Sequence, residues 1–242
     1  MLQVCPNGSR AEGVPVSPEE IAAAVRAAAD VGAQDAHLHP RDGAGADTLD
    51  AFHVAAAVSA VRASTPAIGV GVATGAGAGA GTGAGTGAGA GERAALIRSW
   101  TVVPDHASVG FHEKGAELLA EALFERGVAV EAGIVSGTDA AERFLRWPHA
   151  HHVLRILAEV TDTDPGTATG TAKALLHELG TRHGRPVLLH GEEGGTWPVL
   201  RLAGRLNLDA RIGLEDTLAL PDGAPAADNA VLVQTARVLL HP

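Results

Sequence analysis

The stretch Asp35-Ala36-His37-Leu38-His39-Pro40-Arg41-Asp42 places two histidines two positions apart at the end of a short apolar segment. Successive side chains of a β-strand point to opposite faces, so His37 and His39 share one face and Leu38 points the other way. Two neighbouring imidazoles at a strand end suit a divalent metal such as zinc, provided that a third ligand comes from elsewhere in the chain. For an isolated pair, two hydrogen-bonded structural histidines would be the better interpretation, so the case for a metal depends on the rest of the chain.

Composition narrows the class of protein. The chain has 242 residues, 46% of them apolar and 3% aromatic, and this length fits one large α/β domain or two small ones. A formal net charge of −10 argues against nucleic-acid binding, which needs a basic surface. The single cysteine, Cys5, excludes internal disulfides and fits a reducing cytoplasm. No membrane span and no secretory signal are visible, so we expect a cytoplasmic protein without a membrane partner.

Short apolar runs alternate with amphipathic segments rich in alanine and leucine. The stretch Ser17-Pro18-Glu19-Glu20 is typical of a helix start, with an N-cap serine, a proline at the first helical position and a capping-box glutamate. The predicted strands cover residues 2–5, 35–39, 67–73, 106–111, 128–134, 153–160, 186–190 and 210–214. The predicted helices cover residues 17–31, 47–63, 92–100, 115–126, 139–145, 167–179, 197–206 and 228–239.

Eight strands, each followed by a helix at a spacing of roughly thirty residues, predict a single (β/α)8 TIM barrel over residues 1–242. A doubly wound open sheet is the alternative, although the turn after the first strand lacks the glycine pattern of dinucleotide-binding folds. Polar residues follow the strands at their C-terminal ends, where such barrels place active sites. They are Asn7, His37, His39, Thr74, Ser108, His112, Glu131, Glu159, His190, Glu215 and Asp216. This clustering favours a catalytic function.

Residues 69–91 are almost entirely glycine and alanine with three threonines. Ordering a glycine costs much conformational entropy, and its missing side chain offers almost no burial in return. We therefore expect a flexible loop at about residues 75–91, over the predicted active-site face. The segment lacks the Gly-Lys-Ser/Thr signature of a phosphate-binding loop.

A set of short strings runs through the whole chain. In the N-terminal part they are Cys5-Pro6-Asn7-Gly8, Pro15-Val16-Ser17-Pro18-Glu19-Glu20-Ile21-Ala22 and His37-Leu38-His39-Pro40-Arg41-Asp42. In the C-terminal part they are His190-Gly191-Glu192, Trp197-Pro198, Arg211-Ile212-Gly213-Leu214-Glu215-Asp216, Leu220-Pro221-Asp222-Gly223 and Asp228-Asn229. Taken in this order, the chain resembles the β-keto acid cleavage enzymes, a family typified by 3-keto-5-aminohexanoate cleavage enzyme.

The resemblance implies a TIM barrel with one catalytic zinc per chain, held by His37, His39 and Glu215. It also implies catalytic roles for Arg211 and Asp216. Glu131 is the implied third catalytic residue and faces the site, and Thr74 is the implied substrate contact. Asn7 and His190, which follow strands, are two further candidates for substrate binding.

The implied reaction is an acyl exchange of the retro-Claisen type. A β-keto acid and acetyl-CoA become acetoacetate and a new acyl-CoA, with acetyl-CoA as cosubstrate. The family resemblance further implies a homo-oligomer whose partners are small molecules. Gly110 departs from the family, many members of which carry asparagine there. The sequence leaves open which β-keto acid is used, because side-chain specificity resides in loops.

The chemistry of these residues agrees with a zinc-dependent reaction on a β-keto acid. Three protein ligands leave one zinc position open, as a catalytic site requires, and a β-keto acid can chelate through its keto oxygen and carboxylate. Arg211 is a poor base but a good bidentate partner for a carboxylate, so the Arg211/Asp216 pair is assigned proton handling and carboxylate binding together. Asp35 or Asp42 could orient a ligating histidine through its second ring nitrogen.

Two other functions stay open at this point. A metal-dependent hydrolase on a TIM barrel would turn over without CoA, and a degraded member of the family would bind zinc without catalysis. The glycine and alanine tract, which departs from the ordered loop expected there, is the reason to consider a degraded member. The cluster of His149, His151 and His152 lies outside all the motifs, and we expect it at a surface or interface.

Overall fold

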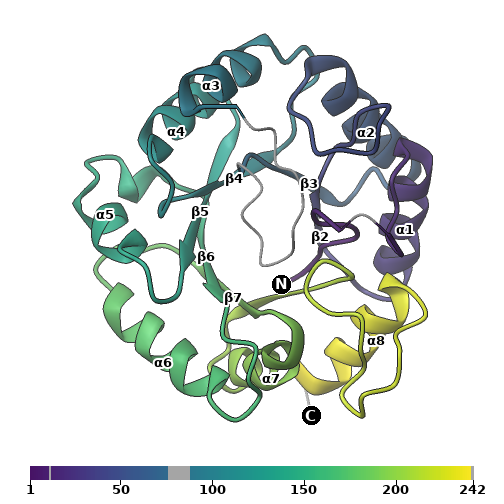
Figure 1. Cartoon of the computed structure of the whole chain (residues 1–242), viewed down its shortest axis with the longest axis vertical. Coiled ribbons are helices and arrows are strands. Elements are labelled where there is room, and N and C mark those ends of the chain that lie inside the picture. Colours follow the sequence, from purple (N-terminus) through teal and green to yellow (C-terminus); the bar gives the residue numbers. More distant parts are fainter. Residues whose placement is uncertain (11, 76–87, 241–242) are drawn as a thin grey trace.

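The computed structural model describes residues 1–10, 12–75 and 88–240. Its eight strands pair in parallel in their order along the chain, and β1 pairs with β8 to close a barrel. Figure 1 looks down this barrel and shows the helices as an outer ring around the strands. The predicted (β/α)8 TIM barrel is confirmed.

The observed elements lie within four residues of the predicted bounds. The strands are β1 (Leu2–Val4), β2 (Asp35–Leu38), β3 (Gly69–Ala73), β4 (His106–Gly110), β5 (Ala129–Val135), β6 (Arg155–Val160), β7 (Val187–Gly191) and β8 (Asp209–Ile212). The helices are α1 (Pro18–Asp30), α2 (Ala51–Ser64), α3 (Ala90–Ser99), α4 (Ala116–Glu125), α5 (Ala140–Arg146), α6 (Ala168–Leu179), α7 (Thr196–Arg205) and α8 (Asn229–Leu240). Two short 3-10 helices, η1 (Ala150–His152) and η2 (Glu193–Gly195), precede β6 and α7.

The start of α1 follows the sequence signal. The Ser17 hydroxyl accepts a hydrogen bond from the Glu20 amide at 3.2 Å, and the Glu20 carboxylate accepts one from the Ser17 amide at 3.0 Å. Pro18 occupies the first helical position, where its missing N–H leaves no donor unsatisfied. The predicted capping box is confirmed.

The start of α2 differs from the prediction. The helix begins at Ala51 with Asp50 as its N-cap, four residues after the expected start at Asp47. Asp47 instead forms an isolated bridge with Arg41, and its carboxylate is held 3.0 Å from the Arg41 guanidinium. Tertiary contacts have therefore outweighed the local capping tendency of this aspartate.

The two faces of the strands carry different kinds of residue. Outward-facing side chains pack against the helices and form the hydrophobic core, among them Leu38, Val70, Val72, Val130, Ile134, Ile156, Leu189 and Ile212. TIM-barrel interiors are usually filled by branched apolar side chains. Here a large part of the interior is polar, and Gln3, Asp35, His106, Glu131 and Arg155 are all buried within it. The interior polar residues form the floor beneath the C-terminal ends of the strands.

Glycines on β3 make room for this polar interior. A Cβ atom added to Gly71 would lie 2.0 Å from Cε1 of His106, and one added to Gly69 would lie 2.6 Å from Oδ2 of Asp35. Both distances are far inside van der Waals contact. The polar side chains of β2 and β4 thus occupy the space that side chains of β3 would otherwise fill.

The predicted flexible loop at residues 75–91 falls mostly on residues 76–87, which lie outside the described residues. Its C-terminal end differs from the prediction, because α3 already begins at Ala90. Among the residues described, no helix is long and apolar enough to cross a membrane.

Replacing Gly71 by alanine tests the packing of β3 against His106. We expect Gly71→Ala to lower the free energy of unfolding by about 1–3 kcal/mol, because the new methyl group displaces a buried ring. Gly170→Ala is the matched control, since nothing lies within 4 Å of the added Cβ within α6. The control should be neutral or stabilising by up to about 1 kcal/mol. Urea denaturation measures both, and equal midpoints for the two variants would contradict this account.

Candidate metal centre and active site

The three predicted metal ligands come together at the C-terminal ends of the strands. His37 lies on β2, His39 follows it directly, and Glu215 follows β8. Nε2 of His39 is 3.4 Å from Oε2 of Glu215, and the centroids of the two imidazole rings are 5.4 Å apart. Donor atoms of His37 and Glu215 also lie within 4.8 Å of each other. Residues separated by about 180 positions in sequence thus form one cluster because β1 pairs with β2 on one side and with β8 on the other in the closed barrel.

Cys5 is a fourth potential donor that sequence reasoning did not place here. Its sulfur lies within 4.8 Å of donor atoms of both His37 and Glu215. Burial raises the pKa of the Cys5 thiol well above its ordinary value, and the neighbouring Glu215 carboxylate raises it further. The signal that could have placed Cys5 here is its position directly after β1, on the same face as Gln3. This strand pairs with both β2 and β8.

The chemistry of these donors fits a divalent metal. Nε2 of His39 and Oε2 of Glu215 face each other, are buried and have no hydrogen-bond partner within the described part of the chain. Buried polar atoms are normally paired, so these two atoms beside His37 indicate a group that belongs between them. Nitrogen, oxygen and sulfur donors are the ligands that zinc takes in proteins.

The charges around the cluster shift the pKa of each candidate ligand. Burial alone would raise the pKa of Glu215, but the positive charges of Arg211 and His39 hold it well below its usual range. Burial alone would lower the pKa of His39, but Glu215 and Asp47 raise it to about 9. Burial and Arg211 lower the pKa of His37 well below its ordinary value, which leaves a neutral imidazole able to ligate.

Arg211 and Asp216 lie beside the cluster, as the sequence analysis expects. Nη2 of Arg211 is 2.8 Å from Oδ1 of Asp216 and 2.9 Å from Oε1 of Glu215. The guanidinium therefore bridges two carboxylates, one of which is a candidate metal ligand. Asp216 is buried, and its second oxygen has no hydrogen-bond partner among the described residues. The catalytic roles of the pair stay predictions.

His190 extends this row of charges toward the mouth of the barrel. Its Nδ1 is 3.2 Å from Oδ1 of Asp216, and its Nε2 is 3.7 Å from Oε2 of Glu159. Although burial and Arg211 lower the pKa of His190, the Asp216 carboxylate and contact with Glu159 raise it to about 9. The imidazole stands between two carboxylates, and neither of its ring nitrogens forms a hydrogen bond among the described residues. Glu159 is the outermost of the three, since its side chain retains 21% exposure.

Asn7 fixes the backbone at His39. Its amide nitrogen donates to the carbonyl oxygen of His39 at 2.8 Å, and its amide oxygen accepts from the His39 N–H at 3.1 Å. The next residue, Gly8, has φ +57°, and an added Cβ would lie 2.3 Å from Cγ of Glu215. The loop after β1 thus supports both His39 and Glu215, while substrate binding by Asn7 stays a prediction.

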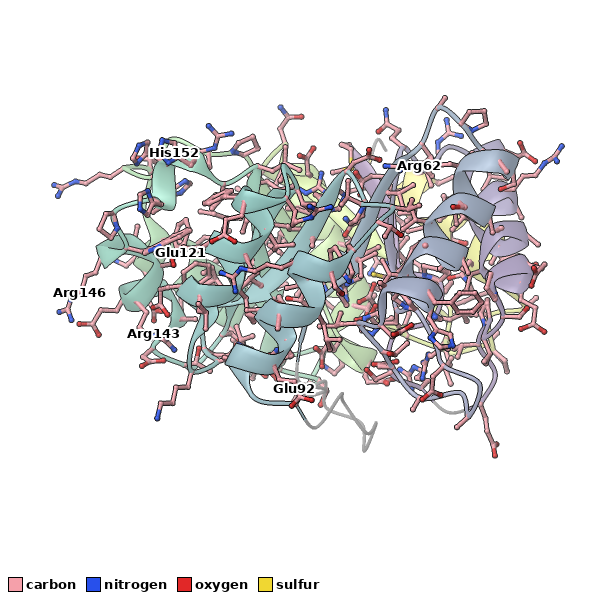
Figure 2. The ribbon with its side chains drawn as sticks, turned by 90° about the horizontal axis from the view of Figure 1, so that it is seen from above. Arg62, Glu92, Glu121, Arg143, Arg146 and His152 are labelled. Carbon is pink, nitrogen blue, oxygen red and sulfur yellow. The ribbon has the colours of Figure 1, made fainter. Side chains whose placement is uncertain are left out.

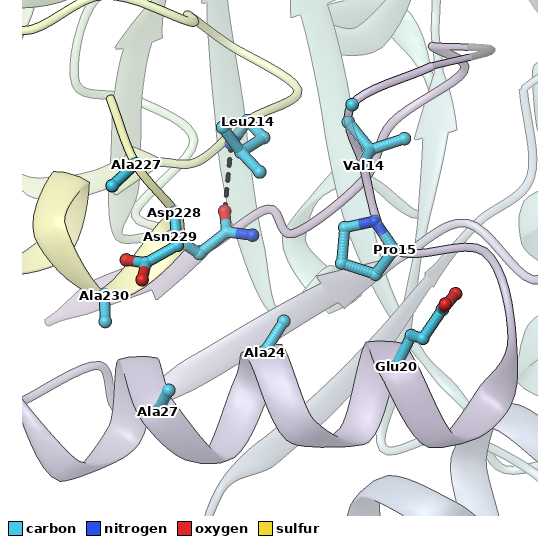
Figure 3. A pocket seen from close by; sticks show the side chains of 11 residues that line it. Val14, Pro15, Glu20, Ala24, Ala27, Leu214, Ala227, Asp228, Asn229 and Ala230 are labelled. Atoms are coloured by element: carbon cyan, nitrogen blue, oxygen red, sulfur yellow. Dashed lines mark hydrogen bonds between the residues drawn. The ribbon is translucent and has the colours of Figure 1, made fainter. Parts of the chain in front are cut away.

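Asn229, at the start of α8, joins the first and last barrel loops. Its side-chain oxygen accepts a hydrogen bond from the Leu214 amide at 2.9 Å, and its nitrogen donates to the Pro6 carbonyl at 3.0 Å. Figure 3 shows the Leu214 contact at the edge of a pocket of about 440 Å³ between α1 and the start of α8. Leu214 directly precedes Glu215, so Asn229 helps to hold that ligand in place.

Thr74 is buried, and its hydroxyl donates to the Ser108 carbonyl at 2.6 Å. Its own carbonyl accepts from Arg93 at 2.7 Å, and Arg93 is paired with Glu113 at 2.6 Å. These bonds fasten the end of β3 to β4 and α3. Substrate binding by Thr74, which the family resemblance implies, stays a prediction.

Glu131 lies below the cluster inside the barrel. Its Oε1 accepts from Nε of Arg155 at 2.5 Å and from Nε2 of Gln3 at 3.3 Å. Nη2 of Arg155 also donates to Oδ1 of Asp35 at 3.0 Å, and Nε2 of His106 lies 3.0 Å from the same oxygen. These five residues form a hydrogen-bonded unit that we call the interior network. Glu131 faces the predicted site from beneath, and a catalytic role for it stays a prediction.

The cluster of His149, His151 and His152 lies at the other end of the barrel. Figure 2 is turned by 90° from the view of Figure 1 and shows His152 and Glu92 at opposite ends of the molecule. Glu92 lies at the start of α3, the helix that follows β3. The rings of His151 and His152 have centroids 3.9 Å apart, and both residues are exposed. These histidines are thus separate from the candidate metal centre, at the surface as expected.

A closed α/β barrel with metal-binding donors and buried acid and base groups at the C-terminal strand ends defines the class as TIM-barrel proteins with an enzyme-like site. Comparison with protein families matches residues 1–241 to the beta-keto acid cleavage enzyme family. The chain belongs to this family, as the resemblance in its sequence implies.

Solved structures show the same fold. The ternary complex of ObcA with a C4-CoA adduct and oxalate matches with a TM-score of 0.72 and 18% identity, over 94% of this chain and 63% of that one. The complex of ObcA with oxaloacetate matches with a TM-score of 0.69 and 18% identity, over 93% of this chain and 63% of that one. This chain therefore spans less than two thirds of the length of ObcA. A type I 3-dehydroquinate dehydratase from Clostridium difficile matches with a TM-score of 0.65 and 11% identity, over 99% of this chain and 90% of that one. Comparison with curated proteins gives no match.

Because of the interior network, the free energy of unfolding depends on pH in the acid range. Burial alone would raise the pKa of Asp35, but the hydrogen bond with His106 and the charges of His106 and Arg155 lower it from 3.8 to about 2. The unfolded chain then binds a proton more readily than the folded chain, so this contribution is present above pH 4 and is lost as the pH falls toward 2. It amounts to about 2 kcal/mol.

We expect Asp35→Asn to have a lower free energy of unfolding at pH 6 and a shallower loss of stability between pH 5 and pH 3 than the wild type. Urea denaturation at a series of pH values measures this slope. A variant that loses stability as steeply as the wild type would contradict the assignment to Asp35.

Proposed function

We propose that this protein is a zinc-dependent β-keto acid cleavage enzyme that exchanges acyl groups between a β-keto acid and acetyl-CoA. The acyl group of the keto acid moves to the CoA sulfur, and the acetyl group takes its place on the acetate carbon. The products are acetoacetate and a new acyl-CoA. Family membership over nearly the whole chain supports this reaction. The single observation that carries it is the cluster of His37, His39 and Glu215, in which Nε2 of His39 and Oε2 of Glu215 are buried without a hydrogen-bond partner among the described residues.

The proposed ligands are His37, His39 and Glu215, with one zinc per chain. Three protein ligands leave a position for substrate oxygen, which the metal when bound polarises as a Lewis acid. Arg211 is held between Asp216 and Glu215 through Nε and Nη2, so the remaining N–H donors of its guanidinium have a fixed direction for a substrate carboxylate. A planar guanidinium suits this task because it donates two parallel hydrogen bonds to a carboxylate.

Proton handling is assigned to the side chains opposite the ligands. Asp216 is the proposed base that takes a proton from the carbon between the keto group and the carboxylate. Arg211 orients the Asp216 carboxylate through the 2.8 Å contact. His190 supports the charge on Asp216 from the other side at 3.2 Å. Thr74, Asn7 and Glu131 complete the proposed set as residues that shape and support the substrate site.

The ObcA complexes support the choice of substrates. ObcA binds oxaloacetate, which is a β-keto acid, and a CoA adduct, on a barrel that this chain shares over 94% of its length. Acetyl-CoA is therefore the proposed cosubstrate here. A cytoplasmic location and a homo-oligomeric state go with this proposal, as does assignment of the whole chain to one catalytic domain.

Metal analysis tests the ligand set directly. Wild-type protein prepared without chelators should hold about one zinc per chain, as a three-ligand catalytic site requires. His37→Ala, His39→Ala and Glu215→Ala should each lose most of the zinc, because each removes one of three ligands. His151→Ala is the control, since this exposed histidine lies at the far end of the barrel. A wild type without zinc, or ligand variants that keep it, would contradict the proposed metal centre.

Turnover tests the reaction. A panel of β-keto acids should yield acetoacetate only when acetyl-CoA is present, whereas a hydrolase would act without it. Asp216→Asn should retain zinc and lower turnover by about 10²- to 10⁴-fold, the usual effect of removing a general base. Zinc binding without exchange on any β-keto acid would favour a degraded, non-catalytic member of the family. Turnover that Asp216→Asn leaves unchanged would exclude this residue as the base.

A further inference from the structure

The two histidines of the metal centre each face a second carboxylate that is not a metal ligand. Nδ1 of His39 lies 3.1 Å from Oδ2 of Asp47. On the other side of the same ring, Nε2 of His39 points to Glu215 at 3.4 Å and has no hydrogen-bond partner among the residues described. The ring is therefore held by one nitrogen and leaves the other for the metal.

Asp47 is itself fixed by its neighbours. Oδ1 lies 3.0 Å from Nη1 of Arg41, and Oδ2 accepts a hydrogen bond from the Ser9 hydroxyl at 2.5 Å. Arg41 also donates to the backbone carbonyls of Gly8, Arg10 and Gly45. A carboxylate with this many contacts has one orientation, and it transmits that orientation to His39.

Glu131 stands in the same relation to His37. Its Oε2 is 3.7 Å from Nδ1 of His37, and both atoms are buried without a hydrogen-bond partner in the described chain. This distance is too long for a hydrogen bond, yet each atom is the nearest ionic partner recorded for the other. Glu131 is anchored through its other oxygen to Arg155 and Gln3, so its free oxygen stays turned toward His37.

We propose that Asp47 and Glu131 are positioning residues that accept the Nδ1–H groups of His39 and His37, so that both imidazoles present Nε2 to the metal. The inference rests on the metal centre of the proposed function. A carboxylate at Nδ1 fixes the tautomer and the ring orientation of a ligating histidine, and its loss typically weakens metal binding. Asp47 carries the stronger case because its hydrogen bond is already formed.

The aspartates that the sequence suggested for this task are engaged elsewhere. Asp42 is half-exposed on the same loop as Asp47, and its Oδ1 accepts from the backbone amides of Ala44 and Ala46. Asp35 lies deeper in the barrel and is bound by His106, Arg155 and Gln3. Neither faces a ring nitrogen of His37 or His39 in the described contacts.

Zinc affinity tests the inference without reference to catalysis. The full chain is stripped of metal and titrated with zinc against a chromophoric chelator. Asp47→Ala should weaken zinc binding by about 10- to 100-fold. Asp47→Asn keeps an oxygen that accepts the Nδ1–H and should recover most of the loss. Asp42→Ala is the matched control on the same loop and should bind like the wild type.

Glu131→Gln extends the test to His37 and should weaken zinc binding in the same direction. Thermal unfolding of the metal-free variants separates a local effect from a loss of fold. Absorption spectra of the cobalt-loaded proteins supply a second readout, because the visible bands report the geometry of the ligands. We expect changed bands for Asp47→Ala and wild-type bands for Asp42→Ala.

The outcomes are distinct. Asp47→Ala that binds zinc as tightly as Asp42→Ala, with unchanged cobalt bands, overturns the inference for His39. Equal loss in Asp47→Ala and Asp47→Asn, accompanied by a lower unfolding temperature without metal, also overturns it in favour of a structural role. The expected affinities together with no acyl exchange would refute the proposed reaction alone. A wild type that binds no zinc would refute both.

Discussion

The contact on which the rest of this barrel depends is that of Arg155 with two buried carboxylates, Glu131 and Asp35. Removing one partner of a buried ion pair leaves an uncompensated charge and typically costs about 3–5 kcal/mol. His106 and Gln3 add hydrogen bonds to these carboxylates, while Oε2 of Glu131 has no hydrogen-bond partner among the described residues and faces His37. A polar unit thus fills a large part of the barrel interior, and most of the hydrophobic core lies outside it, between strands and helices.

This arrangement connects the candidate metal centre to the interior of the barrel. Asp35 and His37 are neighbours on one face of β2, and Glu131 belongs to the interior network while facing His37. The candidate ligands therefore stand on a floor of charged groups with fixed positions. On the opposite side, Arg211 joins Glu215 to Asp216 and His190, which continues the alternation of charge toward the mouth. In a site of this kind, the side chains that contact the candidate ligands do more to fix its geometry than the ligands themselves.

The order of strands and helices could be predicted from sequence because alternation of apolar runs and amphipathic segments is a local property. His37, His39, Glu215, Arg211 and Asp216 were found from strand ends and from motifs of the family. The interior network was not, because Arg155 and His106 acquire their partners only when strands far apart in sequence pair with one another. The sequence predicts a helix start at Asp47, because the local tendency of this residue to cap a helix gives no sign of Arg41 and His39. The sequence does not predict Cys5 as a metal donor, because only barrel closure brings it beside Glu215.

The pairing of β1 with β8 determines when the candidate metal centre can form during synthesis of the chain. A growing chain contains Cys5, His37 and His39 once β1 and β2 are made, whereas Glu215 and its support Asn229 emerge only after β8. Until β8 pairs with β1, Glu215 is not held near the two histidines, so the candidate metal centre is incomplete. A metal that binds only the complete cluster would favour the closed ring over partly folded forms. A chain that stops short of Glu215 would hold two histidines without the third proposed ligand, so metal retention would distinguish closed barrels from shorter fragments.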